Sequence, residues 1–363
     1  MSAVSIRPLE RTEELEAVVD LEIAVWGLKP RDAVPSSLLH VYVLNGGAVI
    51  GAFDAERLIG VCFAFPARRD NRTFLWSHMT GVHPDFQGKG VGFDLKQSQR
   101  VWAIEHGYDE IRWTFDPLQR GNANFNLHLL GAVASTYYVN FYGEMTDSIN
   151  GGLPSDRVEV VWHLRDKRVE NLSAGGAPYP LAADSPVDCF LLKVSNDQRP
   201  VTDILVDSAD RYFIEIPFDL SCLKRTDPDL AQVWRVELRL AFQEAFIKGY
   251  ILTDFVTDGD RCWYVLLRSP VWYLYVVECS DGSLYTGVTT HLNRRVAQHN
   301  RGKGAAYTAA RLPVRLVAAW QFAGRSQALR AEARFKGTSR DAKIRCVREK
   351  LPYCGAPFVE LDL

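Results

Sequence analysis

Long apolar runs are absent from this 363-residue sequence. There is no uncharged apolar stretch of about eighteen residues, the length that a membrane-spanning helix needs. The segment Met1 to Arg7 also lacks the apolar core and small-residue cleavage site of a signal peptide. These absences argue against membrane-spanning and secreted proteins, so we expect a cytoplasmic protein with no membrane partner.

Cysteine is scarce and irregularly placed. The seven cysteines are an odd number, and no two of them are spaced as a C-x-x-C pair. This pattern supports neither a disulfide framework nor a structural zinc site. We expect the thiols to be reduced and mostly structural.

Acidic residues are scarce in one part of the chain only. Residues 271–350 hold 15 Lys and Arg against 5 Asp and Glu, a net charge of +10, whereas residues 1–270 hold 27 against 37, a net charge of −10. A compact basic unit beside an acidic one favours a polyanion-binding module joined to a domain of another function. The alternative is a solvated basic surface. With 47% apolar residues, the chain can form two or three globular units.

The first 165 residues alternate strand-like and helix-like patterns. Expected strands are 47–53, 58–66, 74–82, 110–115 and a β-rich run over 132–142, and expected helices are 11–26, 93–106 and 122–130. The first two strands are expected to form a hairpin. This order predicts a mixed α/β fold with an antiparallel start.

The stretch 166–186 is rich in Asp, Lys, Ser, Gly, Ala and Pro without periodicity, so we expect an internal linker or exposed loop. Beyond it, the expected strands are 212–217, 252–256 and 263–267, with a helix that Thr226-Asp227-Pro228 opens and Gly249 ends. The predicted domains are 1–268, with a core of 1–165 and an extension of 187–268, and 271–350.

A glycine-rich turn, with Gln87, Gly90 and Gly92, separates the expected strand 74–82 from the helix 93–106. Glycines let the backbone come close to a pyrophosphate, and the first amides of the following helix direct their N–H groups and dipole toward it. Lys89 adds a cation. A tight connection without a ligand is the alternative.

The turn follows the Q/R-x-x-G-x-G/A pattern, and with its surrounding elements it resembles the GNAT acyltransferase superfamily. The resemblance implies acetyl-CoA or another acyl-CoA as donor, bound by the backbone of Phe86, Gln87, Gly88, Lys89, Gly90, Val91 and Gly92. It also implies a general-acid tyrosine four residues before Gly131, where this sequence has Leu127. The nearby alternatives for the acid are His128, Tyr137, Tyr138 and Tyr142. The sequence does not identify the acyl acceptor.

The sequence changes character from residue 272, where a β run over 272–277 is followed by a turn at 280–282 and a second β run over 283–288. This pattern resembles the GIY-YIG nuclease superfamily. Tyr273-Leu274-Tyr275 occupies the place of the first motif, without its glycine, and Tyr285-Thr286-Gly287 that of the second. The match is closest to the small single-domain bacterial members, which lack the downstream asparagine of longer ones.

The resemblance implies five functional side chains, which are Tyr275, Tyr285, Arg295, His299 and Glu332. Arg295 and His299 are four residues apart and share one face of the helix 292–299. Glu332 lies on a helix that Ser326 is expected to cap, where the superfamily places its metal-binding glutamate.

Phosphodiester hydrolysis needs a base for the water, a cation for the phosphorane and a Lewis acid for the leaving oxygen. A tyrosine whose pKa is lowered by Arg295 is the expected base, and Arg295 itself is the expected clamp. Mg²⁺ held by Glu332 is the expected Lewis acid. His299 is expected to support the residues that act directly on the substrate.

Hairpin geometry decides whether the two tyrosines can share a site. A two-residue loop would place Tyr275 and Tyr285 on opposite faces of the hairpin. A three-residue loop, Ser280 to Gly282 with Gly282 left-handed, pairs Cys279 with Ser283 and places both tyrosines on one face. We predict the three-residue loop.

The sequence therefore predicts a bifunctional protein, with an acyl-CoA-dependent N-acetyltransferase domain and a Mg²⁺-dependent DNA endonuclease domain. DNA is the expected partner of the basic C-terminal domain, where the loop Arg301-Gly302-Lys303-Gly304 is expected to contact phosphates. The alternative is an acetyltransferase whose inactive GIY-YIG domain only binds nucleic acid.

Overall fold

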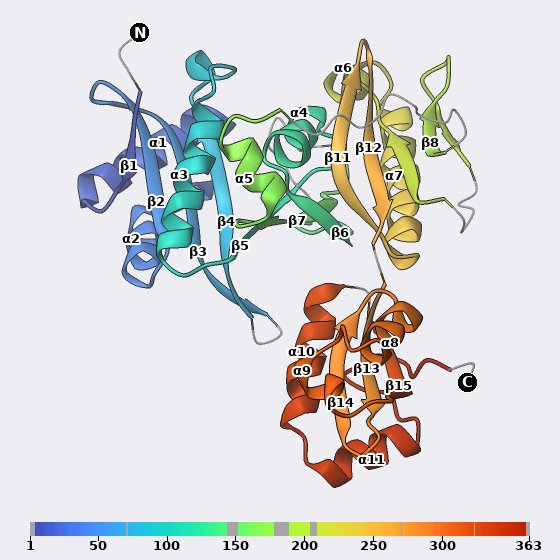
Figure 1. The fold of residues 1–363 in the computed structure, drawn as a ribbon. Coiled ribbons are helices and arrows are strands. Elements are labelled where there is room, and N and C mark those ends of the chain that lie inside the picture. Colours follow the sequence, from blue (N-terminus) through green and yellow to red (C-terminus); the bar gives the residue numbers. More distant parts are fainter. Residues whose placement is uncertain are drawn as a thin grey trace. The chain divides into compact units, whose positions relative to one another are not determined.

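The computed structural model of the protein describes residues 4–69, 72–143, 152–177, 189–203, 209–269, 271–322 and 324–360. The chain divides into two compact units, Met1–Arg268 and Ser269–Leu363, coloured blue to yellow and orange to red in Figure 1. Both units combine helices with β-sheet, which confirms the expected mixed α/β class. Within the described part of the chain, every helix is too short or too polar to cross a membrane.

Twelve strands of the first unit form one sheet, in the order β1-β2-β3-β4-β5-β7-β6-β11-β12-β10-β8-β9. They are β1 (Ser5–Pro8), β2 (Ala48–Asp54), β3 (Arg57–Arg69), β4 (Arg72–Val82), β5 (Glu110–Phe115), β6 (Val133–Tyr138), β7 (Arg157–His163), β8 (Phe190–Val194), β9 (Pro200–Thr202), β10 (Arg211–Glu215), β11 (Tyr250–Asp258) and β12 (Arg261–Arg268). The strands β1 to β4 are antiparallel, as the predicted hairpin requires, whereas β4 and β5 are parallel.

Helices cover both faces of the first half of this sheet. The helices of the unit are α1 (Thr12–Trp26), α2 (Ser36–Leu44), α3 (Val91–Glu105), α4 (Arg120–Ala123), α5 (Lys167–Ser173), α6 (Leu220–Thr226) and α7 (Pro228–Ile247). Val49 of β2 packs with Val18 of α1, whereas the next residue, Ile50, packs with Leu95 of α3. Because consecutive strand residues face opposite sides, α1 and α3 lie on opposite faces, and Figure 1 shows α3 running across β2 to β4.

The region after residue 187 continues the same sheet. Leu252 of β11 pairs with Ala134 of β6, and one hydrophobic cluster contains both Trp162 of β7 and Trp234 of α7. The helix α7 begins as its sequence predicts, because the Asp227 carboxylate accepts a hydrogen bond from the Leu230 N–H at 2.9 Å. The segments on either side of residues 166–186 therefore share one core.

Two local expectations differ from the structure. The stretch 166–186 was expected to be a linker or loop, which is wrong for its first part, because Lys167–Ser173 forms the helix α5 with Val169 and Leu172 buried. Two apolar residues are too few to give a visible period, and residues 178–186 lie outside the described part. The helix expected at 122–130 is instead the short α4 followed by a π-helical segment, η3 (Asn124–Leu129).

The second unit has a three-stranded antiparallel sheet in the order β14-β13-β15. Its elements are β13 (Trp272–Glu278), β14 (Leu284–Thr289), α8 (Leu292–Asn300), α9 (Ala306–Ala309), β15 (Arg315–Phe322), α10 (Arg325–Gly337) and α11 (Arg340–Arg348). Leu274 and Val276 face a core with Ala331 of α10, whereas Tyr275 faces a core with Val296 of α8. Because α10 begins at Arg325, the expected cap residue Ser326 is not at the N-cap position, and its side chain lies outside the described part.

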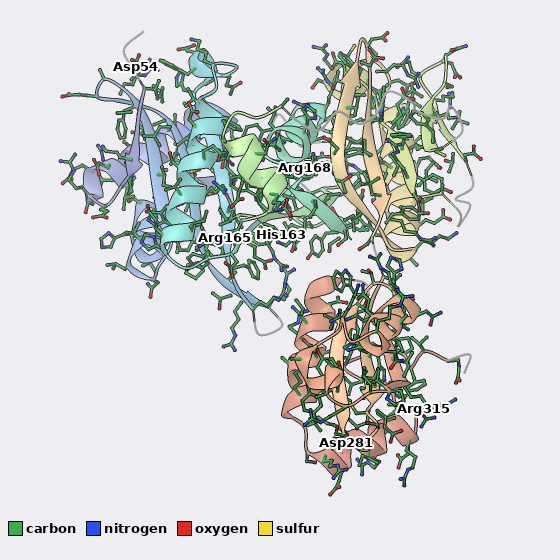
Figure 2. All side chains as sticks on the ribbon, viewed as in Figure 1. Asp54, His163, Arg165, Arg168, Asp281 and Arg315 are labelled. Carbon is green, nitrogen blue, oxygen red and sulfur yellow. The ribbon has the colours of Figure 1, made fainter. Side chains whose placement is uncertain are left out.

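The predicted three-residue hairpin loop is confirmed. The Cys279 N–H donates to the Ser283 carbonyl at 2.8 Å, and Gly282 is left-handed with φ 75°. Asp281, labelled in Figure 2, accepts a hydrogen bond from the Ser283 N–H at 2.9 Å and stabilises the turn. Tyr285 pairs with Val277, two residues after Tyr275, so both tyrosines lie on one face of the hairpin.

Candidate active sites

The first candidate site is a pocket of about 740 Å³ between β4 and β5. These strands pair only at Leu75 with Ile111 and at Trp76 with Arg112. From Ser77 and Trp113 onward, side chains of both strands line the pocket, together with residues of α3 and η3. The separation of two neighbouring parallel strands thus creates an opening in the middle of the sheet.

A β-bulge lies at the same place on β4. Ala64 pairs with Ser77 and Phe63 with Met79, so His78 is the extra residue of the bulge. His78 lines the pocket, and burial lowers the pKa of its imidazole. Because a bulge leaves backbone polar groups out of the ladder, this part of β4 can present them to a bound molecule.

The turn predicted to cradle phosphates opens onto this pocket. Phe86, Gln87, Gly88, Gly90 and Gly92 line it, and Gly88 and Gly90 are left-handed with φ 71° and 86°. Gly90 is the N-cap of α3 and has no side chain that could cap the helix. The first amides of a fifteen-residue helix therefore point toward the pocket mouth, as an anion site requires.

The remaining two residues of that turn have different places. Val91 is buried against Leu95 and the sheet, so only its backbone can take part in binding. The Lys89 Nζ donates to the Asp85 carbonyl at 2.6 Å and lies 5.0 Å from the centre of the Phe86 ring. Lys89 is exposed beside the turn, where its charge is available to a phosphate.

The side chains considered as the general acid do not line the pocket. Tyr137 donates to the Asp156 carboxylate at 2.8 Å and Tyr138 to the Glu159 carboxylate at 2.7 Å. Burial raises the pKa of both hydroxyls. Leu127 is fully buried, and Tyr142 is exposed outside the residues that line the pocket.

His128 contacts the extension of the sheet instead of the pocket. Its Nδ1 lies 3.0 Å from the Asp254 carboxylate of β11. Asp254 also pairs at 3.0 Å with Arg168 of α5, which is labelled in Figure 2. His128 therefore belongs to a charged cluster that joins η3, α5 and β11.

Sequence patterns did not single out Lys96, a buried lysine of the pocket wall. The buried residues of α3 are Val91, Leu95, Lys96, Gln99 and Ala103. A lysine on the apolar face of an amphipathic helix was the available signal.

The second candidate site is a chain of hydrogen bonds around Tyr275 in the second unit. The Tyr275 hydroxyl lies 2.7 Å from Nε2 of His299, and Arg295 Nε donates to the same hydroxyl at 3.1 Å. On the other side of the ring, Nδ1 of His299 lies 2.7 Å from the Thr308 hydroxyl. Thr308 in turn donates to the Ala305 carbonyl at 2.8 Å.

These contacts assign a direction to every proton in the chain. The Thr308 hydroxyl donates its hydrogen bond to the Ala305 carbonyl, so the Thr308 oxygen accepts a hydrogen bond from His299 Nδ1–H. Nε2 of the neutral imidazole is then free to accept, and the Tyr275 hydroxyl donates to it while accepting from Arg295. Burial and the nearby Arg295 charge lower the pKa of His299, which agrees with the neutral ring.

One electrostatic expectation for Tyr275 is wrong in its net direction. Arg295 lowers the pKa of the Tyr275 hydroxyl as expected, but burial has the larger and opposite effect. The pKa of Tyr275 is therefore raised above its ordinary value. Because the hydroxyl is not ionised beforehand, it can act as a base only by passing its own proton to His299.

Two glycines are required by the tight packing of this site. A Cβ added at Gly287 would lie 2.6 Å from the Tyr275 hydroxyl oxygen, and one added at Gly304 would lie 2.2 Å from Nδ1 of His299. Gly287 thus lets the Tyr275 hydroxyl pass close to β14. Gly304, a residue of the loop predicted to contact phosphates, packs closely against the His299 ring.

Tyr285 and Glu332 lie at the margins of this site. Tyr285 contacts the His299 ring edge-on with 5.3 Å between ring centres and stacks on Tyr307 at 6.1 Å. The Glu332 carboxylate, 17% exposed, accepts from Lys336 Nζ at 2.8 Å. After burial and the Arg295 and Tyr285 effects, the negative charge of Glu332 is a further influence on the Tyr275 hydroxyl, and it raises the pKa.

Glu332 is the candidate metal ligand. Within the described residues, no group of three or more His, Cys, Asp and Glu side chains could hold a metal ion. A single carboxylate still fits Mg²⁺, because this ion keeps several waters and takes its other ligands from substrate phosphates.

Sequence reasoning missed Thr308 and Tyr307, since no helix or strand period links them to His299.

Two family models match this chain, one in each unit. The acetyltransferase (GNAT) family model matches residues 15–131, and the GIY-YIG catalytic domain model matches residues 271–345. A UPF0213 protein of Streptococcus agalactiae serotype V is 53% identical over 84 residues, which are 23% of this chain and 94% of that protein. A UPF0213 protein of Nitratidesulfovibrio vulgaris is 46% identical over 77 residues, 21% of this chain and 70% of that protein.

Solved structures of acetyltransferases resemble part of this chain. An N-acetyltransferase from Staphylococcus aureus Mu50 is 15% identical and covers 45% of this chain and 100% of its own, with a TM-score of 0.37. A GNAT family acetyltransferase from Elizabethkingia anophelis with acetyl-CoA bound is 16% identical and covers 45% of this chain and 99% of its own, with a TM-score of 0.34. Through its C-terminal GIY-YIG domain this chain belongs to the UPF0213 family, and its N-terminal unit contains a GNAT acetyltransferase domain.

Proposed function

We propose that the chain is a bifunctional enzyme, with an acyl-CoA-dependent N-acyltransferase in the first unit and a Mg²⁺-dependent DNA endonuclease in the second. The nuclease activity is carried by one observation, the directed hydrogen-bond chain from Arg295 through Tyr275 and His299 to Thr308. The acyltransferase activity is carried by another, the uncapped start of α3 at the mouth of the pocket between β4 and β5.

In the nuclease, Tyr275 and His299 act together as the base. A water molecule attacks phosphorus and gives its proton to the Tyr275 oxygen, while the Tyr275 proton moves to Nε2 of His299 over 2.7 Å. The P–O bond to the leaving oxygen breaks as the new P–O bond forms. Thr308 keeps the Nδ1 proton in place throughout, so Nε2 is always the atom that accepts.

Charge on the reacting phosphate is balanced by two groups. Arg295 is beside the Tyr275 oxygen and supplies a fixed positive charge next to the attacking water. Glu332 would hold Mg²⁺, which supplies the Lewis acid for the leaving oxygen when bound. Tyr285 packs against the His299 ring and orients it.

The charge of the second unit supports a polyanionic substrate. Residues 271–350 carry a net charge of +10, and Arg294 and Arg295 line an open groove beside the site with Gln298. Binding to phosphates through such residues releases counter-ions, so it weakens steeply with salt.

Cleavage of branched and single-stranded DNA with Mg²⁺ tests the nuclease. We expect cleavage by the wild type, loss of cleavage by Glu332→Ala, and little change in the matched surface variant Glu349→Ala. DNA binding without any cutting by the wild type would support the alternative of a domain that only binds nucleic acid. Equal cutting by Glu332→Ala would overturn the proposed nuclease.

Calorimetry with acetyl-CoA tests the acyltransferase. Gly90→Glu places a side chain and a negative charge at a left-handed position beside the pyrophosphate, so we expect binding to vanish. Gly259→Glu is the control, because Gly259 is also left-handed and open but lies in the turn between β11 and β12. Unchanged affinity in Gly90→Glu would count against the turn.

A further inference from the structure

A lysine amine lies where β4 and β5 separate. Lys96 of α3 is 2% exposed, and its Nζ donates to the Ser77 hydroxyl at 3.1 Å. The same Nζ lies 3.9 Å from the centre of the Trp113 ring. Ser77 and Trp113 directly follow the last paired residues of the two strands, so the amine marks the inner end of the pocket.

This amine has no counter-ion among the described residues that surround it. Its other partner is the neutral Gln99 Oε1, at 2.7 Å, and none of the described residues that line the pocket is Asp or Glu. The titratable groups nearby are Cys62, whose pKa burial raises to about 12, and His78, whose pKa burial lowers. Both are uncharged at neutral pH.

A buried ammonium without a counter-ion is unstable. Loss of hydration disfavours the charged form, and burial lowers the pKa of Lys96 to about 7. A carboxylate within hydrogen-bond distance would stabilise the charged form and regain part of this free energy. The lysine side chain is therefore suited to receive a negative charge that the protein itself does not supply.

We propose that the inner end of this pocket binds a carboxylate group of an acyl-transfer substrate, with Lys96 as its cationic partner. The inference rests on the acyl-CoA binding proposed above. The pocket lining runs from the turn at Phe86 to Ser77 and Trp113. A donor whose pyrophosphate lies at α3 would direct its acyl group along this path, which favours a dicarboxylic acyl-CoA as the source of the carboxylate. A carboxylate on an amino-acid acceptor has the same chemistry.

Calorimetry of the full chain with CoA, acetyl-CoA and succinyl-CoA at pH 7 tests the donor as the source. A charge-assisted hydrogen bond is worth about 1.5–3 kcal/mol, so succinyl-CoA is expected to bind about 10- to 100-fold more tightly than acetyl-CoA. This preference should disappear in Lys96→Met. It should persist in Lys167→Met, which removes an exposed lysine at the start of α5.

Lys96→Met is expected to fold, because replacing a buried charge with an apolar side chain of similar length is often neutral or stabilising. Proton uptake gives a second readout that a structural role would not change. Succinyl-CoA should raise the Lys96 pKa and take up a proton on binding above pH 7, measured from heats in two buffers of different ionisation enthalpy. Its affinity should fall as pH rises, whereas that of acetyl-CoA should not.

A third titration tests the acceptor as the source, with glycine and methylamine compared in the presence of CoA. A preference for glycine that Lys96→Met abolishes would assign the carboxylate to the acceptor. The inference is overturned if neither carboxylate-bearing ligand is preferred, or if the preference survives in Lys96→Met, while binding of CoA itself would still support the acyltransferase. Failure of the wild type to bind CoA would overturn both.

Discussion

The proton of a neutral histidine can occupy either ring nitrogen, and the Thr308 hydroxyl decides between them for His299. Because Thr308 donates to Ala305, its oxygen can only accept from Nδ1–H. Nε2 is then the basic atom, and it lies 2.7 Å from the Tyr275 hydroxyl. Thr308 is thus a positioning residue, which contacts Nδ1 of His299 and not Nε2, the atom that accepts the proton.

Replacing Thr308 tests this role. Thr308→Val keeps the shape of the side chain but removes the oxygen that accepts from Nδ1, so we expect cleavage to fall by about 10- to 100-fold. The ¹⁵N chemical shifts of His299 should show loss of the Nδ1–H form. Thr308→Ser keeps the hydroxyl and should retain both. An unchanged tautomer in Thr308→Val would contradict the assignment, whatever the cleavage rate.

The pH dependence of cleavage follows from the same pair. The pKa of His299 lies below its ordinary value of about 6.5, so Nε2 stays free to accept at neutral pH. As pH falls through that pKa, the imidazole takes a proton and the base is lost, by about tenfold for each pH unit. The raised pKa of Tyr275 keeps its proton in place through the mildly alkaline range. A rate that increases below pH 6 would contradict this base.

The sequence predicted some residues of the Tyr275 site and not others. Tyr275, Arg295 and His299 were found because motif spacing and the i, i+4 helix rule do not depend on tertiary structure. Thr308 was not found, because its contact with His299 arises when α9 folds back on α8. The net pKa shift of Tyr275 was also out of reach, since it depends on how deeply the hydroxyl is buried.

At the scale of elements, α7 is fixed to the sheet by a buried ion pair. The Arg235 guanidinium donates to both oxygens of Asp116 at 2.9 and 2.7 Å, and the two side chains are 1% and 7% exposed. Asp116 directly follows β5, which lines the pocket between β4 and β5. The position of α7 is therefore coupled to the strand that forms one wall of the pocket.

Arg235→Met should destabilise the first unit strongly. Removing Arg235 leaves the buried Asp116 carboxylate with only a longer, 3.9 Å ion pair to Arg157, and breaking a buried ion pair costs about 3–5 kcal/mol. The double variant Asp116→Asn with Arg235→Met should lose less, because the carboxylate that Arg235 neutralises is removed together with Arg235. Urea denaturation of the full chain measures both, through the transition of the first unit. Equal losses in the two variants would mean that packing, and not charge, is the cause.

Helices were predicted correctly where the spacing of apolar residues extended over several turns, or where Pro or Gly marked an end of the helix. The helix α7 was expected from its spaced apolar residues, the Asp227-Pro228 start and the glycine after its end. The short α5 was missed, because seven residues with two buried side chains give no readable period. A helix was predicted over residues 122–130, but the π-helical form of η3, which packs against β11, was not.

At the scale of the whole molecule, the two units have separate hydrophobic cores. The clusters around Trp320 and around Tyr275 contain only residues of the second unit. We therefore expect residues 269–363 expressed alone to unfold cooperatively and to keep the cleavage activity of the full chain. Circular dichroism melting and the DNA assay check this. A fragment without a cooperative transition would show that the first unit is needed for its folding.

The join between β6 and β11 also has a consequence for aggregation. A chain ending near residue 165 would leave β6 as an open edge, whose unpaired N–H and C=O groups could recruit strands from another copy. In the intact sheet the outermost strands are β1, of four residues, and β9, of three. Strands this short are poor templates for strand addition. The extension thus protects the first unit from polymerising through its own sheet.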